Sequence, residues 1–247
     1  MAADGLLAET VPFRGHGNDE ISGYLARPTS GGPYPGVVVI HAVAGIVTHI
    51  KEVARRIADH GYVTLAPDLH HREGPGEPDD VAAVVRAAGG NPDARTIGDV
   101  EGAMRHLRAI ALCTGKIGVI GYCSGGRQTY LVACNIPSID AAVSCYGGRI
   151  VTGPEGLNPR QPKAPIDMTK GMKGALLGLF GIEDANPSPE QVQQIEQELK
   201  RHRKTYEIKV YENASHGFFA DYRPSYRQHA AVDGWERVFT WFGKHLG

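Results

Sequence analysis

The chain has 247 residues, of which 42% are hydrophobic and 21% are charged, so it can bury a large core and does not resemble a disordered protein. Its formal net charge of −1 lacks the positive excess of a nucleic-acid binder, and we expect no nucleic-acid partner. No apolar run reaches the roughly 18 residues of a membrane helix, and residues 1–10 lack the pattern of a signal peptide. We therefore expect a cytoplasmic protein with no membrane partner.

Cysteine and histidine spacing gives no sign of a disulfide framework or a metal centre. The cysteines contain no C-x-x-C pair of the kind found in structural zinc sites. The neighbours His70 and His71 lack a matched Asp or Glu spacing. We expect free thiols, no metal and no cofactor. The cysteines are Cys113, Cys123, Cys134 and Cys145.

The hydrophobic pattern predicts an α/β fold. Ala8–Arg14 and Glu20–Ala26 alternate polar and apolar residues, which favours an antiparallel hairpin. Short apolar runs then alternate with helical patterns, which predicts a single domain over residues 1–247, with a mostly parallel central sheet and helices on both faces. The predicted strands are Val37–Ile40, Tyr62–Ala66, Lys116–Ile120, Ile139–Cys145, Ala175–Phe180 and Thr205–Tyr211. The predicted helices cover Ile50–Ala58, Asp80–Ala88, Ala94–Leu112, Gly125–Cys134, Ser188 to about His202 and Tyr226–His245, and residues 147–173 are a long loop.

The segment Gly121–Gly126 lies between a predicted strand and a predicted helix. Its sequence GYCSGG matches the nucleophile elbow G-x-S-x-G of α/β-hydrolase folds, with Cys123 in the serine position. The turn is so tight that side chains at the flanking glycines would collide. A thiol at the N-terminus of a helix has its pKa lowered from about 8.5. The alternative interpretation is a buried structural cysteine beside a glycine-rich turn.

Two residues further along the chain complete a triad in the order of this fold, which is nucleophile, acid, base. Asp184 follows the strand Ala175–Phe180, with Glu183 as the local alternative, and His216 follows the last strand. We expect His216 to take the thiol proton and Asp184 to hold its tautomer. Ser124 stands one residue too late to be the nucleophile, so its N–H is expected to serve as an oxyanion-hole donor together with the N–H of Val43.

Several blocks of the sequence together resemble the dienelactone hydrolase family (carboxymethylenebutenolidase) of the α/β-hydrolase superfamily. The resemblance implies Cys123, Asp184 and His216 as the triad. It also implies that water opens an unsaturated lactone through an acyl-thioester. The blocks are Val37–Gly45, Arg55–Ala58 with Gly61–Val63, Ala66–Leu69, Gly121–Gly126, Gly178–Asp184 and His216–Phe218.

The chain departs from this family at two places. Ala42 stands where members carry a glutamate that helps activate the cysteine, so the thiol must rely on His216 and the helix N-terminus. Arg72 stands where one arginine of a carboxylate clamp is expected, but the second position falls at Ala220, with Arg223 nearby. A broader esterase or lactonase is therefore an open interpretation. The substrate-binding candidates are Arg72, Ala42, Tyr122, Phe218 and Arg223.

These residues predict an enzyme that cleaves a small ester or lactone, acting as a monomer or weak homodimer. The loop 147–173 and the segment His71–Pro78 are expected to shape its pocket. One alternative is a ligand-binding protein on a hydrolase scaffold without chemistry, which Ala42 motivates. Another is a thiol redox protein that pairs Cys123 with Cys134 or Cys145.

Overall fold

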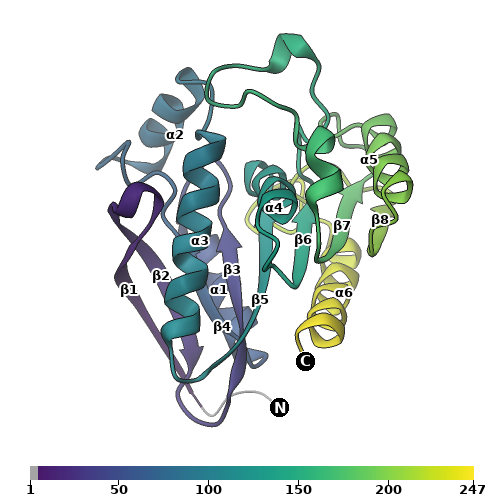
Figure 1. Ribbon diagram of the computed structural model, residues 1–247. Coiled ribbons are helices and arrows are strands. Elements are labelled where there is room, and N and C mark those ends of the chain that lie inside the picture. Colours follow the sequence, from purple (N-terminus) through teal and green to yellow (C-terminus); the bar gives the residue numbers. More distant parts are fainter. Residues whose placement is uncertain (1–4) are drawn as a thin grey trace. The chain divides into compact units, whose positions relative to one another are not determined.

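The computed structural model describes residues 5–247 and has an α/β fold with one mixed, mostly parallel eight-stranded sheet, as predicted (Figure 1). The strand order is β1-β2-β4-β3-β5-β6-β7-β8. The strands are β1 (Leu6–Arg14), β2 (Glu20–Pro28), β3 (Tyr34–Ile40), β4 (Val63–Pro67), β5 (Cys113–Tyr122), β6 (Ala141–Cys145), β7 (Ala175–Gly181) and β8 (Tyr206–Tyr211). The α-helices are α1 (Thr48–Asp59), α2 (Pro78–Ala87), α3 (Asp93–Ala109), α4 (Ser124–Asn135), α5 (Pro189–Arg201) and α6 (Gln228–Leu246). Short 3₁₀ helices are η1 (His16–Asn18), η2 (Pro154–Gly156) and η3 (Pro165–Gly171).

The described chain divides into two compact units. Unit 1 runs to Val119 and includes Asn158–Pro162, whereas unit 2 comprises Ile120–Leu157 and Lys163–Gly247. The single domain over residues 1–247 stays a prediction, and residues 1–4 lie outside the described part.

Unit 1 contains the predicted N-terminal hairpin. Strands β1 and β2 pair antiparallel, β2 pairs antiparallel with β4, and β3 pairs parallel with β4. Successive side chains of a strand point to opposite faces. On one face of the sheet, the Thr64 hydroxyl donates to the carbonyl of Ala54 in α1. The next residue, Leu65, points to the other face, where it lies with Phe13 around the space above Gly23. The Phe13 ring lies 5.9 Å from that of His106 in α3, so α1 and α3 cover opposite faces of this part of the sheet.

Unit 2 is built on parallel strands. Strand β7 pairs parallel with β6 and with β8, and α4 and α6 both pack against β6. Parallel strands bring their carboxyl ends to one edge of a sheet, where open α/β sheets carry their sites. Helix α5 begins with the predicted capping box, in which Ser188 and Gln191 exchange hydrogen bonds.

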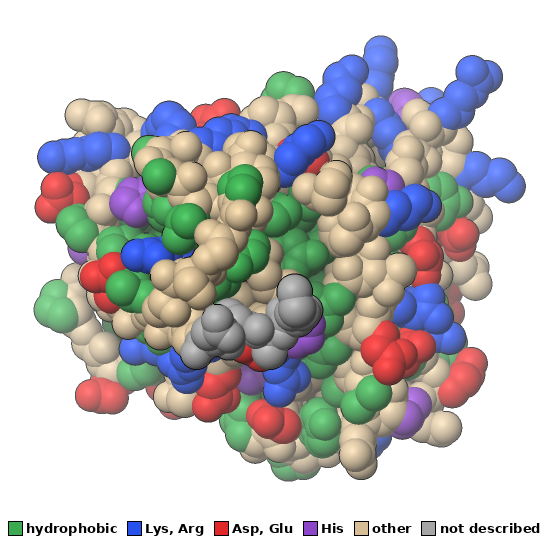
Figure 2. Space-filling model, turned by 90° about the horizontal axis from the view of Figure 1, so that it is seen from below, with side chains coloured by type: hydrophobic (Ala, Val, Ile, Leu, Met, Phe, Trp, Pro, Cys, Tyr) green, Lys and Arg blue, Asp and Glu red, His purple; other side chains and the backbone are tan. Residues whose placement is uncertain are grey.

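The observed elements differ from the predicted ones mainly in their ends. Strand β3 begins at Tyr34, and β5 continues to Tyr122, directly before the elbow. The loop 147–173 contains η2 and η3, and its segment 158–162 is held in unit 1 by bonds such as Arg160 Nη1 to the Gly90 carbonyl, 3.2 Å. Basic and acidic side chains are interspersed over the face displayed in Figure 2. Within residues 5–247, no helix has the length and apolar character needed to span a membrane.

Candidate active site

Cys123 occupies a strained turn between β5 and α4. Its backbone has φ 57° and ψ −119°, in a region that residues with a Cβ rarely adopt. The turn is held by bonds from Cys123 N to the Cys145 carbonyl, 3.1 Å, and from Gly126 N to the Cys123 carbonyl, 2.9 Å. A Cβ on Gly121 would lie 2.2 Å from the carbonyl oxygen of Gly125, so this position accepts only glycine. The local geometry is that of the predicted elbow.

Asp184 and His216 meet at the ends of β7 and β8. His216 Nδ1 lies 2.8 Å from Asp184 Oδ2, and Asp184 is 5% exposed. The other carboxylate oxygen accepts the N–H of Asn186 at 2.9 Å, which holds the side chain in place. Glu183, the competing candidate, is exposed to solvent. Nδ1 therefore donates to the carboxylate, which leaves Nε2 for proton transfer.

The pKa values of Cys123 and His216 shift in opposite directions. Burial opposes the thiolate, but hydrogen bonding and charge from His216 lower the pKa of Cys123 below its usual value. Burial also opposes the imidazolium, yet Asp184 and Cys123 together raise the pKa of His216 to about 10. The stable form of this pair is therefore thiolate with imidazolium, as in cysteine hydrolases with a paired histidine.

Ser124 and Arg223 add to this effect within unit 2. The backbone N–H of Ser124, the first residue of α4, lowers the pKa of Cys123, and so does the charge of Arg223. Arg223 is exposed, with its guanidinium 5.5 Å from the centre of the Tyr222 ring. The sequence analysis predicted Arg223 as a substrate-binding residue, which stays a prediction, and in the structure its charge acts on the Cys123 thiol.

Tyr146 is a site residue that the sequence reading missed. It follows β6 directly, is 3% exposed and has a positive φ of 39°. Its ring lies edge-on to the His216 imidazole at 5.1 Å. The signal available in the sequence was its position at the end of a buried strand, because functional residues in this fold lie at the carboxyl ends of the strands.

Tyr122 and Phe218 are buried beside Tyr146. Tyr122 is 2% exposed and Phe218 0%, and their rings lie 6.1 and 5.2 Å from that of Tyr146. Phe218 also contacts Phe219 at 4.9 Å. These positions give both side chains a packing role under the histidine, and their contact with substrate stays a prediction.

Arg72, in unit 1, is engaged by two carboxylates. Its Nη1 lies 2.9 Å and its Nη2 3.1 Å from the two oxygens of Asp99, and its Nε lies 2.8 Å from Asp19. Asp99 is fully buried and also accepts the N–H of His16 at 2.8 Å. Hydrogen bonds to both carboxylates raise the pKa of Arg72, Asp99 first. The guanidinium thus links α3 to the hairpin. Most of its N–H donors are used in these hydrogen bonds, two of them in the bidentate pair with Asp99.

Ala42 and Val43 lie on the half-buried loop after β3 in unit 1. His41, just before them, is 1% exposed, and its Nδ1 donates to the Ala42 carbonyl at 2.7 Å. Its Nε2 accepts the N–H of Leu69 at 3.1 Å. Both ring nitrogens are therefore used to join this loop to the one after β4. The oxyanion-hole donor Val43 stays a prediction.

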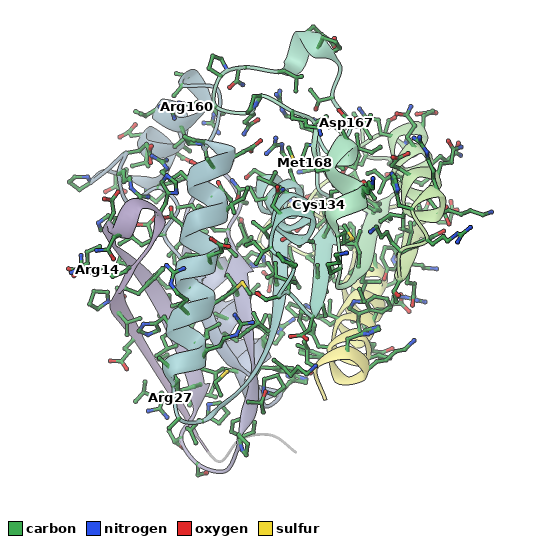
Figure 3. All side chains as sticks on the ribbon, in the orientation of Figure 1. Arg14, Arg27, Cys134, Arg160, Asp167 and Met168 are labelled. Carbon is green, nitrogen blue, oxygen red and sulfur yellow. The ribbon has the colours of Figure 1, made fainter. Side chains whose placement is uncertain are left out.

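The other two thiols of unit 2, those of Cys134 and Cys145, are unreactive because they are buried. Cys134 on α4 packs against η3, the element that carries Asp167 and Met168 (Figure 3), and its Sγ is 4.0 Å from the Pro165 carbonyl oxygen. Burial raises the pKa of Cys134 to about 12 and that of Cys145 well above its usual value. All four cysteines are free. In the described part of the chain, no cluster of three potential metal ligands occurs.

Comparison with known proteins places the chain in a family. A family model described as the dienelactone hydrolase family matches residues 21–246. The chain belongs to the dienelactone hydrolase family. It is therefore a hydrolase of carboxylic esters by family, as the sequence resemblance implied.

Individual members of the dienelactone hydrolase family match over nearly the whole chain. A protein of Escherichia coli K12 assigned as a carboxymethylenebutenolidase is 36% identical over 96% of this chain and 86% of its own length. A relative with the same assignment from Methylorubrum extorquens is 35% identical over 98% of this chain and 83% of its own. A crystal structure assigned as a dienelactone hydrolase, from Klebsiella pneumoniae, aligns with a TM-score of 0.89 at 32% identity, over 97% of this chain and 99% of that one.

Proposed function

We propose that this chain hydrolyses small esters or lactones through a Cys123–His216–Asp184 triad and a cysteine acyl-enzyme. The observation that carries the proposal is the strained Cys123 backbone at the elbow, together with a His216 that is bonded to a buried carboxylate and lowers the pKa of the thiol. The family membership supports the same reaction class.

The proposed reaction has two halves. The Cys123 thiolate attacks the ester carbonyl carbon, and the tetrahedral intermediate collapses to a thioester while the His216 imidazolium gives its proton to the departing alkoxide. In a lactone that alkoxide stays attached to the acyl group. His216 Nε2 then accepts a proton from water, whose oxygen attacks the thioester. The C–S bond then breaks and the acid is released, which restores the Cys123 thiolate beside the His216 imidazolium.

Negative charge on the carbonyl oxygen needs hydrogen-bond donors in both halves. The Ser124 N–H is the proposed donor from unit 2, because it already stabilises negative charge at Cys123. The second proposed donor remains the Val43 N–H of unit 1.

Ala42 leaves the activation of the thiol to other groups. We propose that His216, the Ser124 N–H and the Arg223 charge substitute for the glutamate that the family carries there. All three favour the thiolate, and they outweigh the effect of burial on the Cys123 pKa. Arg223 is then also the proposed partner for a negatively charged group of a substrate, since Arg72 is engaged by Asp99 and Asp19.

Selective alkylation tests the proposal. Cys113 is the other cysteine that is not buried, so the experiment uses the Cys113→Ser variant, in which iodoacetamide can react readily only at Cys123. We expect the untreated variant to hydrolyse phenyl acetate and one equivalent of iodoacetamide to abolish turnover. Unchanged turnover after complete alkylation of Cys123, checked by mass spectrometry, would contradict the cysteine mechanism.

A further inference from the structure

Strand β8 leaves one edge of the sheet open in unit 2. It is the last strand, and β7 is its only neighbour among the strands of residues 5–247 (Figure 1). Each of residues 206–210 is half-buried, whereas the residues of β6 and β7 are all buried. An open strand edge presents unpaired N–H and C=O groups, which are a template for pairing with another chain.

The hydrogen bonds between β7 and β8 show which backbone groups of β8 are free. The N–H of Ile182, directly after β7, donates to the Tyr211 carbonyl, so the odd-numbered residues of β8 face β7. Successive residues of a strand direct their backbone groups to alternate sides. Those of Tyr206, Ile208 and Val210 therefore point to the open edge, and no loop or side chain of residues 5–247 hydrogen-bonds to them.

The charged side chains of β8 lie on the face of the sheet that α6 covers. The Glu207 carboxylate is 44% exposed and pairs with Arg237 of α6. The Lys209 ammonium lies 5.4 Å from the centre of the Tyr211 ring and forms no ion pair with residues 5–247. Lysine on an edge strand disfavours pairing with another chain, but here a carboxylate lies two residues away on the same face. The edge thus carries both signs of charge.

These charges select one register for antiparallel pairing with a second copy of β8. Only residues that face the open edge can exchange hydrogen bonds, so Ile208 must pair with an even-numbered residue of the other copy. Pairing Ile208 with Tyr206 sets Glu207 opposite Glu207. Pairing it with Val210 sets Lys209 opposite Lys209. Pairing Ile208 with Ile208 sets Glu207 opposite Lys209 twice, at the non-hydrogen-bonded positions where opposite side chains are closest.

We propose that β8 pairs antiparallel with β8 of a second copy, about a two-fold axis between the two Ile208 residues, to form a homodimer with one continuous sheet. Tyr206, Ile208 and Val210 of the two copies then exchange about six hydrogen bonds. Glu207 of each copy meets Lys209 of the other, which supplies the carboxylate that Lys209 lacks within its own chain. The contact is small, so the dimer dissociates on dilution.

Charge variants test the register. Lys209→Glu sets carboxylates opposite each other and Glu207→Lys sets ammonium groups opposite each other, so we expect each to raise the dimer Kd at least about tenfold. An equimolar mixture of the two variants restores opposite charges at both pairs and should dimerise with about the wild-type Kd. Lys163→Glu, the same change of charge at an exposed loop position, is the control and should leave the Kd unchanged. Sedimentation equilibrium gives each Kd.

Hydrogen exchange on the wild type tests the backbone contact without any substitution. As the protein concentration rises through the Kd, the amides of Tyr206, Ile208 and Val210 should gain protection. Those of Glu207 and Lys209 are already bonded to β7 and should not change. A wild type that stays monomeric at about 300 µM, a mixture that dimerises no better than either variant alone, or a dimer that protects amides elsewhere instead would overturn the proposal.

Discussion

Three groups oppose the effect of burial at Cys123. His216 contributes most, and the Ser124 N–H and the Arg223 charge follow. The Arg223 side chain is exposed, so salt should screen its effect on the Cys123 pKa. Salt should screen the interaction between Cys123 and His216 less, because that pair is largely buried. Alanine at position 42, in place of the family's glutamate, therefore still leaves the Cys123 thiolate favoured.

Asp184 and Glu183 are adjacent carboxylates with different surroundings. Asp184→Asn replaces the buried acceptor of His216 Nδ1, which destabilises both the productive tautomer and the imidazolium. We expect kcat on phenyl acetate to fall by about 10⁴ with the fold intact. Glu183→Gln, at an exposed position, should leave kcat unchanged. Similar losses in the two variants would contradict the role of Asp184.

Arg72 stabilises a buried carboxylate. Arg72→Met leaves Asp99 charged and without its main partner, and we expect the free energy of unfolding to fall by about 3 kcal/mol in urea denaturation. Arg86→Met, on the exposed face of α2, serves as the matched control and should change stability little. Adding Asp99→Asn to Arg72→Met should recover much of the loss. If Arg72→Met instead raises KM for 4-acetoxybenzoate at unchanged stability, Arg72 is a substrate clamp.

At the level of elements, the β5–α4 turn depends on a position without a side chain. Gly121→Ala would place a Cβ 2.2 Å from the Gly125 carbonyl oxygen, so the turn must open and Cys123 must move. We expect loss of activity and destabilisation by about 3 kcal/mol or more. Gly243→Ala in α6 is the control, because its Cβ meets nothing within 4 Å, and it should stabilise the protein by about 0.5 kcal/mol. Retained activity in Gly121→Ala would rule out the elbow geometry.

For the whole molecule, the Cys123–His216 pair predicts a pH profile of stability. Above about pH 8.5 the unfolded thiol ionises, while folded His216 keeps its proton to about pH 10. The folded state then holds more protons than the unfolded state, so stability falls as pH rises through this range.

The measurement is the difference in free energy of unfolding between the wild type and Cys123→Ala across pH 7–10. Other groups that titrate contribute to both proteins and cancel. We expect this difference to fall between about pH 8.5 and 10. A difference that stays level or rises over this range would mean that His216 does not hold its proton beside the ionised thiol.

Much of the fold was predictable because its signals are local. The hairpin, the parallel strands and the capping box at Ser188 and Gln191 each follow from residues close together in the chain. The elbow and the chain order of Cys123, Asp184 and His216 were readable for the same reason. What the sequence by itself determined is thus the order of the elements and the candidate residues for the chemistry.

Only the tertiary structure decided which distant groups meet. Arg72 pairs with Asp99 and Asp19, which lie 27 and 53 positions away in the chain. Tyr146 reaches His216 because β6 and β8 flank β7. The local sequence pattern does not predict such pairings, because they arise from packing and desolvation between segments far apart in the chain.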